Sequence, residues 1–352
     1  MKIIKTENKI ICQNPNSMFN YFGWPTVGRL PDGTLAMVCS GFRLAHVCPF
    51  GKSVICYSRD EGKTWTKPAV VIDTPQDDRD SGIVTAGGKV MLNTFNNGYN
   101  TPIGNRCKND DHYKLPVSAG YLSQLDLDAV DREYAGSLYV LSDDGYEFGP
   151  IYRSPVTTPH GGCPLPDGRI FFVGRGLDEK GVYSSDLYCY IFDMEENSWT
   201  LISEIPCPED KAFYCEPHVV VLDDRIIVQI RTSDFQMHQC ESFDGGKTFT
   251  APHKLIDHGS PPHLLRHSSG VLISVYGYRL EPFGQRVMLS YDNGETWETD
   301  YILRDDAHCG DLGYPATVEL ADGSLLTVYY QKPEGLDNTV IMQSVWKLPD
   351  HK

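Results

Sequence analysis

Five arginines stand beside apolar, strand-like segments, and they are the side chains from which chemistry is most readily inferred. Four of them end such a segment and the fifth begins one: Arg43, Arg175, Arg231, Arg279 and Arg286. A guanidinium group pairs with a carboxylate through two parallel hydrogen bonds, so several guanidiniums at one place form a site for an anion. The alternative is that individual arginines only pair with nearby acids such as Asp80 or Asp311.

Groups able to transfer a proton occur where other strand-like segments begin. They are Asp80, His160, Glu216, His218, His263 and Tyr314. Trp24 begins a further segment, and Tyr276 and Tyr278 end one, so these rings are candidates for stacking on a sugar, with packing in the protein core as the alternative. The histidines lack the spacing of a metal site, and hydrogen bonds to neighbouring residues are the favoured interpretation, so no metal ion is predicted.

These residues need a framework that brings distant segments together, and a repeated turn indicates what it is. SRDEGKTW (Ser58 to Trp65), SFDGGKTF (Ser242 to Phe249) and SYDNGETW (Ser290 to Trp297) share the pattern Ser-x-Asp-x-Gly-x-Thr-aromatic. SDDGYEF (Ser142 to Phe148) is interpreted as a degenerate copy. Asp hydrogen-bonds nearby backbone N–H groups and Gly tolerates positive φ, so each copy predicts a tight turn. An apolar, β-rich segment precedes each clear copy, which indicates a hairpin in a repeated all-β unit.

A second repeat consists of a strand, a turn often written Asp-Gly, and another strand. Its copies span residues 24–43, 80–96, 160–176, 216–231, 261–279 and 314–330. Six copies predict an all-β fold, a six-bladed β-propeller, in which the first strand of each blade lines the axis and the second runs back antiparallel. The arginines and the proton-transferring groups would then collect on one face. Asp60, Asp244 and Asp292 would lie on the opposite face, so they are interpreted as turn formers.

The two ends of the chain are predicted to share one blade. The last blade lacks a fourth strand, and the N-terminal KIIKTENKIICQ is able to supply it, so residues 1–352 are interpreted as one propeller domain with Asp-box turns, closed by its N-terminal strand. The longest spacing, residues 97–150, is interpreted as an insertion between blades two and three. It is either a lid over the axial pocket or an ordinary surface loop, and SQLDLDAVDREYAG within it favours a short helix.

The repeated turns resemble the Asp-box (BNR) repeats of the sialidase (neuraminidase) superfamily of β-propellers, and the resemblance extends to single positions. Glu216 and Arg231, in EPHVVVLDDRIIVQIR, are similar to the Glu and Arg of the fourth innermost hairpin of sialidases. Tyr314, in YPATVELADG, is similar to the Tyr that begins their last innermost strand. A third Arg of that family is matched by either Arg279 or Arg286.

The resemblance implies a glycoside hydrolase that removes a terminal acidic sugar with retention of configuration, with Tyr314 as nucleophile and Glu216 as its base. A sialic acid carries a carboxylate at its anomeric carbon, which repels an Asp or Glu nucleophile, whereas a phenol is neutral. The pKa of a free Tyr is about 10, so a neighbouring base and arginines are needed. The residues expected to contact the substrate are Arg231, Arg279 and Arg43, with Arg286 and Arg175 as further candidates, and His160, Trp24 and Tyr278.

Two positions depart from the sialidase pattern. Sialidases open with Phe-Arg-Ile-Pro, whereas this chain has Phe-Gly-Trp-Pro at residues 22–25, so the first Arg that would hold the substrate carboxylate is absent. Arg43 is the expected replacement. The acid/base Asp of the family falls within GFRLAHVCPFG, where His46 is the one group suited to carry a proton at neutral pH. The acid/base role is therefore assigned to His46 or Asp80, with a loop His without chemistry as the alternative for His46.

These departures leave the substrate open between a sialic acid-like sugar and another acidic sugar such as a uronic acid. Two other functions fit the same residues. One is a lyase acting on a uronate-containing oligosaccharide, in which arginines neutralise the carboxylate while His or Tyr transfers a proton. The other is a sugar-binding propeller without catalysis. The linkage, the stereochemical outcome and the oligomeric state, a homo-oligomer included, are not determined by the sequence.

Charge and composition narrow the other classes of partner. The formal net charge of -16 argues against nucleic acid and against an anionic membrane, because both bind basic surfaces. The N-terminal MKIIKTENKIICQ has charged residues within its apolar part, so no signal peptide is predicted. The eleven cysteines form no CxxC pair, which together with the missing export signal favours the cytoplasm. No phosphate-binding loop or dinucleotide motif occurs, so no cofactor is predicted.

Overall fold

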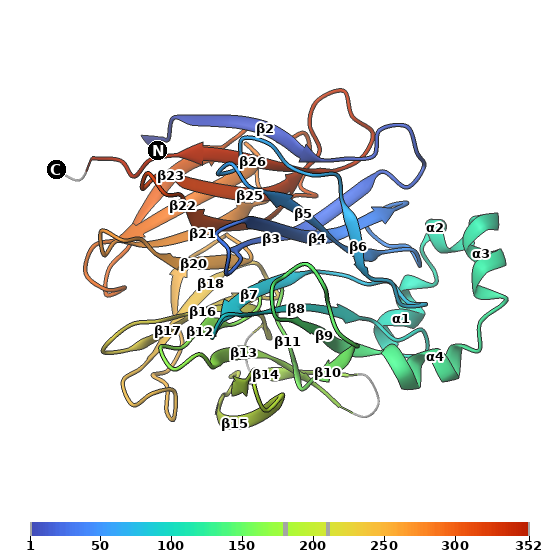
Figure 1. Ribbon diagram of the computed structural model, residues 1–352, viewed down its shortest axis with the longest axis horizontal. Coiled ribbons are helices and arrows are strands. Elements are labelled where there is room, and N and C mark those ends of the chain that lie inside the picture. The colour runs from blue at the N-terminus through green and yellow to red at the C-terminus, as the bar shows by residue number, and fades with distance from the viewer. Residues whose placement is uncertain (1, 179–181, 209–211, 351–352) are drawn as a thin grey trace.

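In the computed structural model, which describes residues 2–178, 182–208 and 212–350, most of the regular structure is β-strand (Figure 1). The first sheet consists of β3 (Tyr21–Arg29), β4 (Leu35–Arg43), β5 (Lys52–Ser58) and β6 (Ala69–Ile72). The second consists of β7 (Gly82–Ala86), β8 (Lys89–Asn96), β9 (Gly136–Ser142) and β10 (Tyr152–Ser154). The third consists of β11 (Val156–Thr157), β12 (Cys163–Pro164), β13 (Ile170–Leu177), β14 (Tyr183–Asp193) and β15 (Ser198–Ile205).

Three further sheets complete the ring. The fourth consists of β16 (Tyr214–Val221), β17 (Ile226–Thr232), β18 (Met237–Ser242) and β19 (His253–Ile256). The fifth consists of β20 (Pro262–Arg266), β21 (Leu272–Tyr278), β22 (Gly284–Ser290), β23 (Glu298–Arg304) and β1 (Lys2–Ile3). The sixth consists of β24 (Gly313–Glu319), β25 (Leu325–Gln331), β26 (Val340–Trp346) and β2 (Thr6–Cys12). The innermost strands contact one another in the closed order β3, β7, β12, β16, β20, β24 and back to β3, which confirms the predicted six-bladed β-propeller.

The N-terminal segment closes the ring as predicted. Strand β2 pairs antiparallel with β26, so that Thr6 lies opposite Trp346 in the sixth blade. The structure adds a second contact, because β1 pairs in parallel with β23 of the fifth blade, with Lys2 opposite Tyr301. The first dozen residues therefore join two neighbouring blades.

The repeated turns have the hydrogen bonds expected of turn formers. Ser58 donates from its hydroxyl to Asp60 at 2.9 Å and accepts from the Gly62 N–H at 2.9 Å, and Asp60 accepts from the Thr64 N–H at 2.8 Å. The copies at residues 242–248 and 290–296 repeat this pattern. Each turn joins the third and fourth strands of its blade, which places it on the face opposite the starts of the innermost strands.

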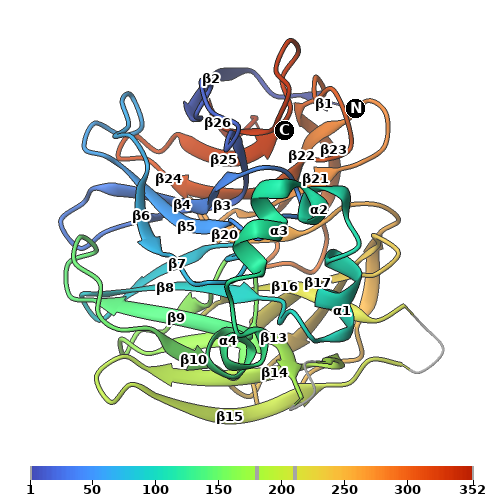
Figure 2. The ribbon, with the colours of Figure 1, turned by 90° about the vertical axis from the view of Figure 1, so that its right-hand side faces the viewer.

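The insertion lies inside blade two and is shorter than expected. Its four short helices, α1 (Pro102–Cys107), α2 (Asp111–Lys114), α3 (Pro116–Leu122) and α4 (Leu127–Tyr134), connect β8 to β9 and stand together in front of the sheets in Figure 2. The sequence interpretation had placed residues 97–150 between blades two and three. Residues 136–142 pair with β8 instead, because doing so buries Leu138 and Val140. The predicted helix within this segment is α4.

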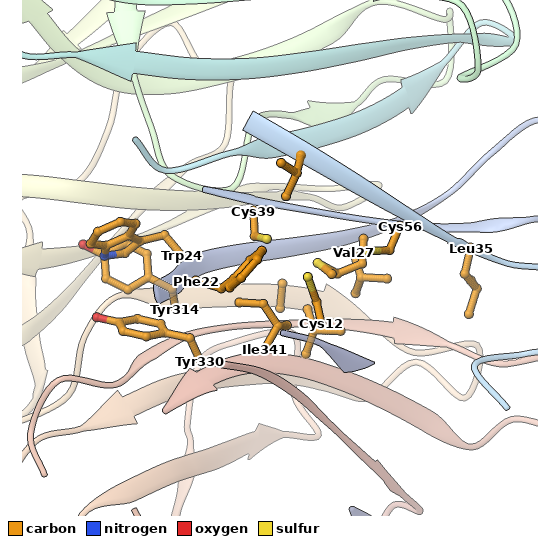
Figure 3. Close-up of a cluster of buried hydrophobic side chains, with 14 of the residues drawn as sticks. Cys12, Phe22, Trp24, Val27, Leu35, Cys39, Cys56, Tyr314, Tyr330 and Ile341 are labelled. Atoms are coloured by element: carbon orange, nitrogen blue, oxygen red, sulfur yellow. The ribbon is translucent and has the colours of Figure 1, made fainter. Parts of the chain in front are cut away.

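The hydrophobic core lies between neighbouring blades. In the cluster between blades six and one, Phe22, Cys39 and Cys56 pack against Cys12 and Ile341 (Figure 3). Burial raises the pKa of the Cys39 thiol, so this side chain stays neutral and packs as a small apolar group, as expected. All eleven cysteines are free thiols. Among the described residues, no helix has the length and apolar composition needed to span a membrane.

Candidate functional site

Three innermost strands begin with the same backbone distortion. Trp24, Glu216 and Tyr314 have φ values of 56°, 47° and 48°, in the left-handed region that few residues other than Gly adopt. Each precedes a proline, and the pairing of each strand with its neighbour shifts at that point. A residue before proline normally favours an extended conformation, so these are strained β-bulges of the kind that redirect a side chain. Blades one, four and six thus present one redirected side chain each.

Two of these residues form a hydrogen-bonded pair, which we call the Tyr–Glu pair. The Tyr314 hydroxyl donates to Glu216 Oε1 at 2.7 Å, and Arg231 donates to the other carboxylate oxygen. Burial opposes ionisation of Glu216, but the Arg231 charge and these hydrogen bonds outweigh it, so the pKa of Glu216 stays below its ordinary value. Burial and the neighbouring Glu216 charge raise the pKa of Tyr314 well above its ordinary value. The pair therefore rests as a carboxylate and a neutral phenol.

A second guanidinium lies beside the Tyr–Glu pair. The Arg279 guanidinium carbon is 5.8 Å from the centre of the Tyr314 ring, and Arg279 Nε donates to the Leu312 carbonyl at 3.1 Å. Phe235 lies against both arginines, with its ring centre 4.8 Å from the guanidinium carbon of Arg231 and 5.8 Å from that of Arg279. Two cations with aromatic contacts therefore flank the phenol.

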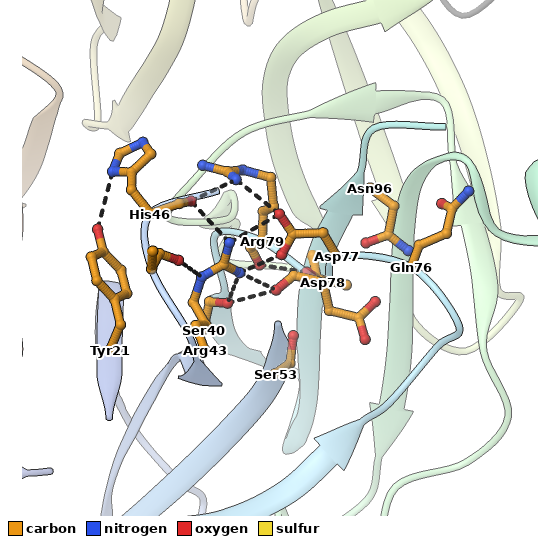
Figure 4. Close-up of polar contacts among 12 residues, drawn as sticks. Tyr21, Ser40, Arg43, His46, Ser53, Gln76, Asp77, Asp78, Arg79 and Asn96 are labelled. Carbon is orange, nitrogen blue, oxygen red and sulfur yellow. Dashed lines mark hydrogen bonds and ion pairs between the residues drawn. The ribbon is translucent and has the colours of Figure 1, made fainter. Parts of the chain in front are cut away.

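The bulge in blade one carries an indole, and two more arginines pack on it. The guanidinium carbons of Arg43 and Arg79 lie 4.8 Å and 4.4 Å from the Trp24 ring centre. Asp77 accepts from Arg43 Nη2 at 2.9 Å and from Arg79 Nη1 at 3.0 Å (Figure 4). We call these four residues the Trp–Arg stack. Trp24 is 2% exposed and Arg43 is fully buried, so Arg43 does not reach a ligand in this structure, contrary to its expected role.

A cavity of about 410 Å³ opens beside the Tyr–Glu pair. Its wall includes predicted site residues from several blades: His46, Asp80, Arg175 and Glu216. Arg79 also faces the cavity, and the insertion supplies a further wall through Ile103, Arg106, Cys107 and Asp110 of α1 and the residues that follow it. Of the two interpretations of the insertion, the structure favours the lid. The cavity is within the size range of small-molecule sites.

Asp80 is the acid in this cavity whose titration is moved to neutral pH. Its side chain is almost fully buried and forms no hydrogen bond with another described residue. Burial raises the pKa of Asp80 to about 7, the nearby Glu216 charge adds to this effect, and the Arg79 charge opposes it. Asp80 is thus divided between its acid and its carboxylate forms near neutral pH.

His46 faces the same cavity and is bonded to a second carboxylate. Its Nδ1 lies 3.0 Å from Asp311 Oδ1 and 3.0 Å from the Tyr21 hydroxyl, the contact drawn in Figure 4. Nearly half of the His46 side chain, 47%, is exposed. Desolvation in this recess lowers the pKa of His46, while the Asp311 carboxylate raises it in part. His46 is therefore mostly neutral at pH 7.

Known proteins that resemble this chain are found by structure and not by sequence. No family model matches the chain, and no curated protein matches its sequence. A protein of unknown function from Dyadobacter fermentans has a TM-score of 0.75 and 23% identity, over 98% of this chain and 99% of that one. The NanB sialidase from Streptococcus pneumoniae has a TM-score of 0.66 and 14% identity, over 97% of this chain and 70% of that one. Trypanosoma rangeli sialidase in complex with sialic acid has a TM-score of 0.61 and 13% identity, over 98% of this chain and 59% of that one.

The fold is that of the sialidases. At these identities the similarity establishes the fold alone, so the site is judged from its own residues. Against the sialidase pattern, Gly23 stands where the first Arg is missing, and Arg79 brings a guanidinium to the cavity from the segment before β7.

Several residues expected at the site lie outside the cavity wall. Arg286 is 4% exposed and donates from Nη2 to the Pro282 carbonyl at 2.8 Å, so its predicted contact with an anion is not available. The Tyr278 ring packs 4.5 Å from the same guanidinium, which occupies it within blade five. Arg175 does face the cavity, with its Nε donating to the Ser184 carbonyl at 2.8 Å.

The histidines near the axis form a buried cluster. His160 is 2% exposed, its ring centre is 6.2 Å from that of Tyr314, and its Nδ1 contacts the Thr26 hydroxyl at 2.9 Å. The His218 and His263 rings are stacked with centres 4.3 Å apart. Burial lowers the pKa of His263 to about 3, and it lowers those of His160 and His218 as well. His160 is therefore a neutral packing residue here and is not positioned to contact substrate, and the described residues contain no group of side chains suited to a metal ion.

Two residues of the cavity region had no assigned role in the sequence. Arg79 lies in the charged run Asp77-Asp78-Arg79-Asp80, directly before β7, and that run was the available signal. Asp311 had been considered only as a partner for an arginine, whereas it binds His46. Neither position repeats between blades, so the repeat pattern gave no indication of their roles.

Proposed function

We propose that this protein is a glycoside hydrolase that removes a terminal acidic sugar with retention of configuration, with Tyr314 as nucleophile and Glu216 as its base. The hydrogen bond of 2.7 Å between these two side chains carries the proposal, because it joins a phenol to a carboxylate at the edge of a sugar-sized cavity. The sialidase fold of the chain supports the same class of reaction.

In the first half of the reaction, the Tyr314 oxygen forms a bond to the anomeric carbon as its proton passes to Glu216. The glycosidic bond breaks, and Asp80 gives its proton to the leaving oxygen. The pKa of Asp80, raised to about 7 by burial, keeps this proton available at neutral pH. Arg231 holds the Glu216 carboxylate in place, so that it faces the phenol.

In the second half, water attacks the anomeric carbon, the bond to Tyr314 breaks, and the phenol regains its proton from Glu216. A base in the cavity takes the proton that the water loses. The sugar leaves with its original configuration because two displacements have occurred at the same carbon.

The arginines define the substrate class. Arg231 and Arg279 flank the phenol, so a carboxylate next to the anomeric carbon would pair with them, and Arg79 would offer a third guanidinium from the Trp–Arg stack. This arrangement suits a sugar acid with its carboxylate close to the bond that is broken. We place the reaction in the cytoplasm, on short oligosaccharides.

The test is a digest of an acidic glycan panel, scored by mass and by the anomeric configuration of the first product. The expected result is addition of one water per bond cleaved, with retention, and loss of turnover in Tyr314→Phe and Glu216→Gln. Asp244→Asn, in a turn on the opposite face, is the control variant and should remain active. Inversion, or full activity in Tyr314→Phe, would rule the mechanism out.

A uronate lyase is the second candidate, and the neutral His46 held by Asp311 favours it. In that reaction a base removes the proton beside the carboxylate, and the glycosidic oxygen leaves as a double bond forms. The product then absorbs in the ultraviolet and gains no water. The same digest separates the two reactions.

A further inference from the structure

Asp311 collects three polar contacts from three different segments. Its carboxylate accepts from the Tyr21 hydroxyl at 3.0 Å and from the Tyr330 hydroxyl at 3.0 Å, and it lies 3.0 Å from His46 Nδ1. The phenols belong to β3 and β25, and Asp311 lies just before β24. Two phenols that are almost fully buried therefore hold the carboxylate in one orientation.

This contact determines which imidazole nitrogen carries the proton. The Tyr21 hydroxyl also lies 3.0 Å from His46 Nδ1, but it donates to Asp311. Because a carboxylate only accepts, the contact between His46 and Asp311 assigns the hydrogen to Nδ1. His46 Nε2 is then the nitrogen with a free lone pair, and it has no hydrogen-bond partner in the part of the chain that the structure describes. Since His46 belongs to the cavity wall, Nε2 is available to a water or substrate bound there.

The groups around His46 keep it neutral and fixed. The Trp24 ring packs edge-on with its centre 5.0 Å from that of the imidazole, and Arg79 donates to the His46 carbonyl at 3.2 Å. The Arg43 and Arg79 charges and desolvation lower the pKa of His46, whereas Asp311 raises it. Arg106 and Asp110 face the same cavity from the insertion.

We propose that His46 is the general base that takes the proton of the attacking water in the second half of the reaction, and that Asp311 is its positioning residue. This inference rests on the proposed function, and it divides proton transfer between two groups. Asp80 gives a proton to the leaving group, and His46 Nε2 accepts one from water. Two titratable groups whose surroundings move their pKa values in opposite directions are a recurring sign of an acid and a base.

The step balances without any further reactant. The water oxygen bonds to the anomeric carbon, its proton moves to His46 Nε2, and the Tyr314 oxygen leaves with the proton returned by Glu216. The imidazolium that forms is stabilised by the Asp311 carboxylate, and it returns its proton to Asp80, directly or through solvent, before the next cycle.

The positioning role can be tested without a substrate, by nitrogen-15 NMR of the histidine rings. In the wild-type protein we expect His46 to be protonated at Nδ1. In Asp311→Asn, which cannot hold a positive imidazole as well, the His46 titration should move to lower pH and the tautomers should mix. Tyr330→Phe, which keeps the Asp311 charge and the Tyr21 hydrogen bond, should change both much less. A His46 that carries its proton at Nε2 in the wild type, or a titration unaffected in Asp311→Asn, would overturn the positioning role.

The base role is tested with an aryl glycoside of the sugar identified by the glycan panel. With a good leaving group, His46→Gln should lower kcat by about 10²–10⁴-fold while kcat/KM changes little, because release of the sugar becomes limiting. Intact-protein mass should then show one sugar bound per chain, lost when Tyr314→Phe is added. His112→Gln is the matched control, because His112 also bonds an aspartate, Asp110, at 2.9 Å but is not part of the cavity wall.

The failures of the two proposals are distinguishable. Equal losses of kcat and kcat/KM in His46→Gln, with no bound sugar, would remove His46 as the base and leave the Tyr314 mechanism standing. The hydrolase proposal itself would fail if neither the wild type nor any variant formed a sugar adduct and the wild type yielded an ultraviolet-absorbing product.

Discussion

Two regions beside the cavity, the Tyr–Glu pair and the Trp–Arg stack, share the same backbone feature but present different chemical groups. In blades four and six, the bulged residues are Glu216 and Tyr314, which bond to each other at 2.7 Å. In blade one, the bulged residue is Trp24, which bonds to neither and packs against Arg43 and Arg79. The bulge therefore fixes the position at which a side chain is presented. The residue type decides whether that side chain is itself charged, as at Glu216, or is apolar and is accompanied by charged residues of other segments, as at Trp24.

The largest effect is expected at the Tyr–Glu pair. Tyr314→Phe keeps the ring and removes only the oxygen that would bond to the sugar. We expect kcat to fall by roughly four orders of magnitude or more, as when a nucleophile is removed elsewhere. Steady-state turnover of the panel substrate measures this effect, and thermal unfolding should show a melting temperature close to that of the wild type. Turnover within about tenfold of the wild type would show that this side is not the reactive one.

The Trp–Arg stack allows a matched pair of variants, because Arg43 and Arg79 share Asp77. Arg43→Met leaves the buried Asp77 carboxylate with only one of its two guanidinium partners. This change should destabilise the protein by about 3–5 kcal/mol. Arg79→Met, at the cavity, should cost less stability and instead weaken binding of the acidic sugar. Urea unfolding and the KM of the panel substrate separate these outcomes. Equal effects of both variants on both measurements would contradict the division between a buried and a ligand-facing guanidinium.

Both the activity and the stability of the protein are expected to depend on pH through Asp80. Its pKa is raised in the folded state to about 7, so the proton is present below that pH and is lost as the pH rises through it. In its proposed role as the acid for the leaving group, Asp80 should make kcat/KM fall above about pH 7, and Asp80→Asn should abolish that decline along with most activity. The stability has the same sign, because the folded state favours the protonated form. Its contribution is complete below the ordinary pKa of an Asp and fades as the pH rises towards 7.

That stability claim has its own measurement. Urea unfolding of wild type and Asp80→Asn should differ most above pH 7, where the buried carboxylate of the wild type is charged. Asp78, whose pKa burial also raises to about 7, remains in both proteins and so cancels in the difference. A difference independent of pH from 5 to 9 would contradict the burial of an ionisable Asp80.

The smallest effect is expected at the insertion. Arg106 lies on α1 and faces the cavity from the insertion, on an element separate from those that carry the Tyr–Glu pair. Arg106→Ala should raise KM a few-fold for substrates with an acidic second sugar and leave kcat nearly unchanged. Lys108→Ala is the control, because Lys108 lies at the C-terminal end of the same helix and outside the cavity wall. An equal change in both variants would show a general charge effect.

Much of the ring was predictable because its signals repeat. The Ser58 to Trp65 turn and its copies gave the hairpins, the six strand pairs gave the blades, and the final unpaired strand gave the closure by β2. Tyr314, Glu216 and Arg231 were brought together by that geometry. These features depend on backbone periodicity, which a sequence displays directly.

The features that could not be predicted depend on the orientation of individual side chains and on single strand pairings. Arg43 and Arg79 lie near the same indole and both bond to Asp77, yet only Arg79 belongs to the cavity wall. The insertion was misplaced because the apolar run at residues 136–142 was counted as part of a linker, whereas it pairs with β8. Single, unrepeated contacts of this kind leave no period in the sequence.

The pairing of β2 with β26 has a consequence for how the molecule is assembled. The blade that carries Tyr314 obtains its outer strand from residues 6–12 and its other three strands from residues 313–346. The ring therefore cannot close until the segment that ends at Trp346 has been synthesised. The sixth blade should accordingly be completed only after all five others can form, and removal of residues 2–12 should loosen this blade before any other.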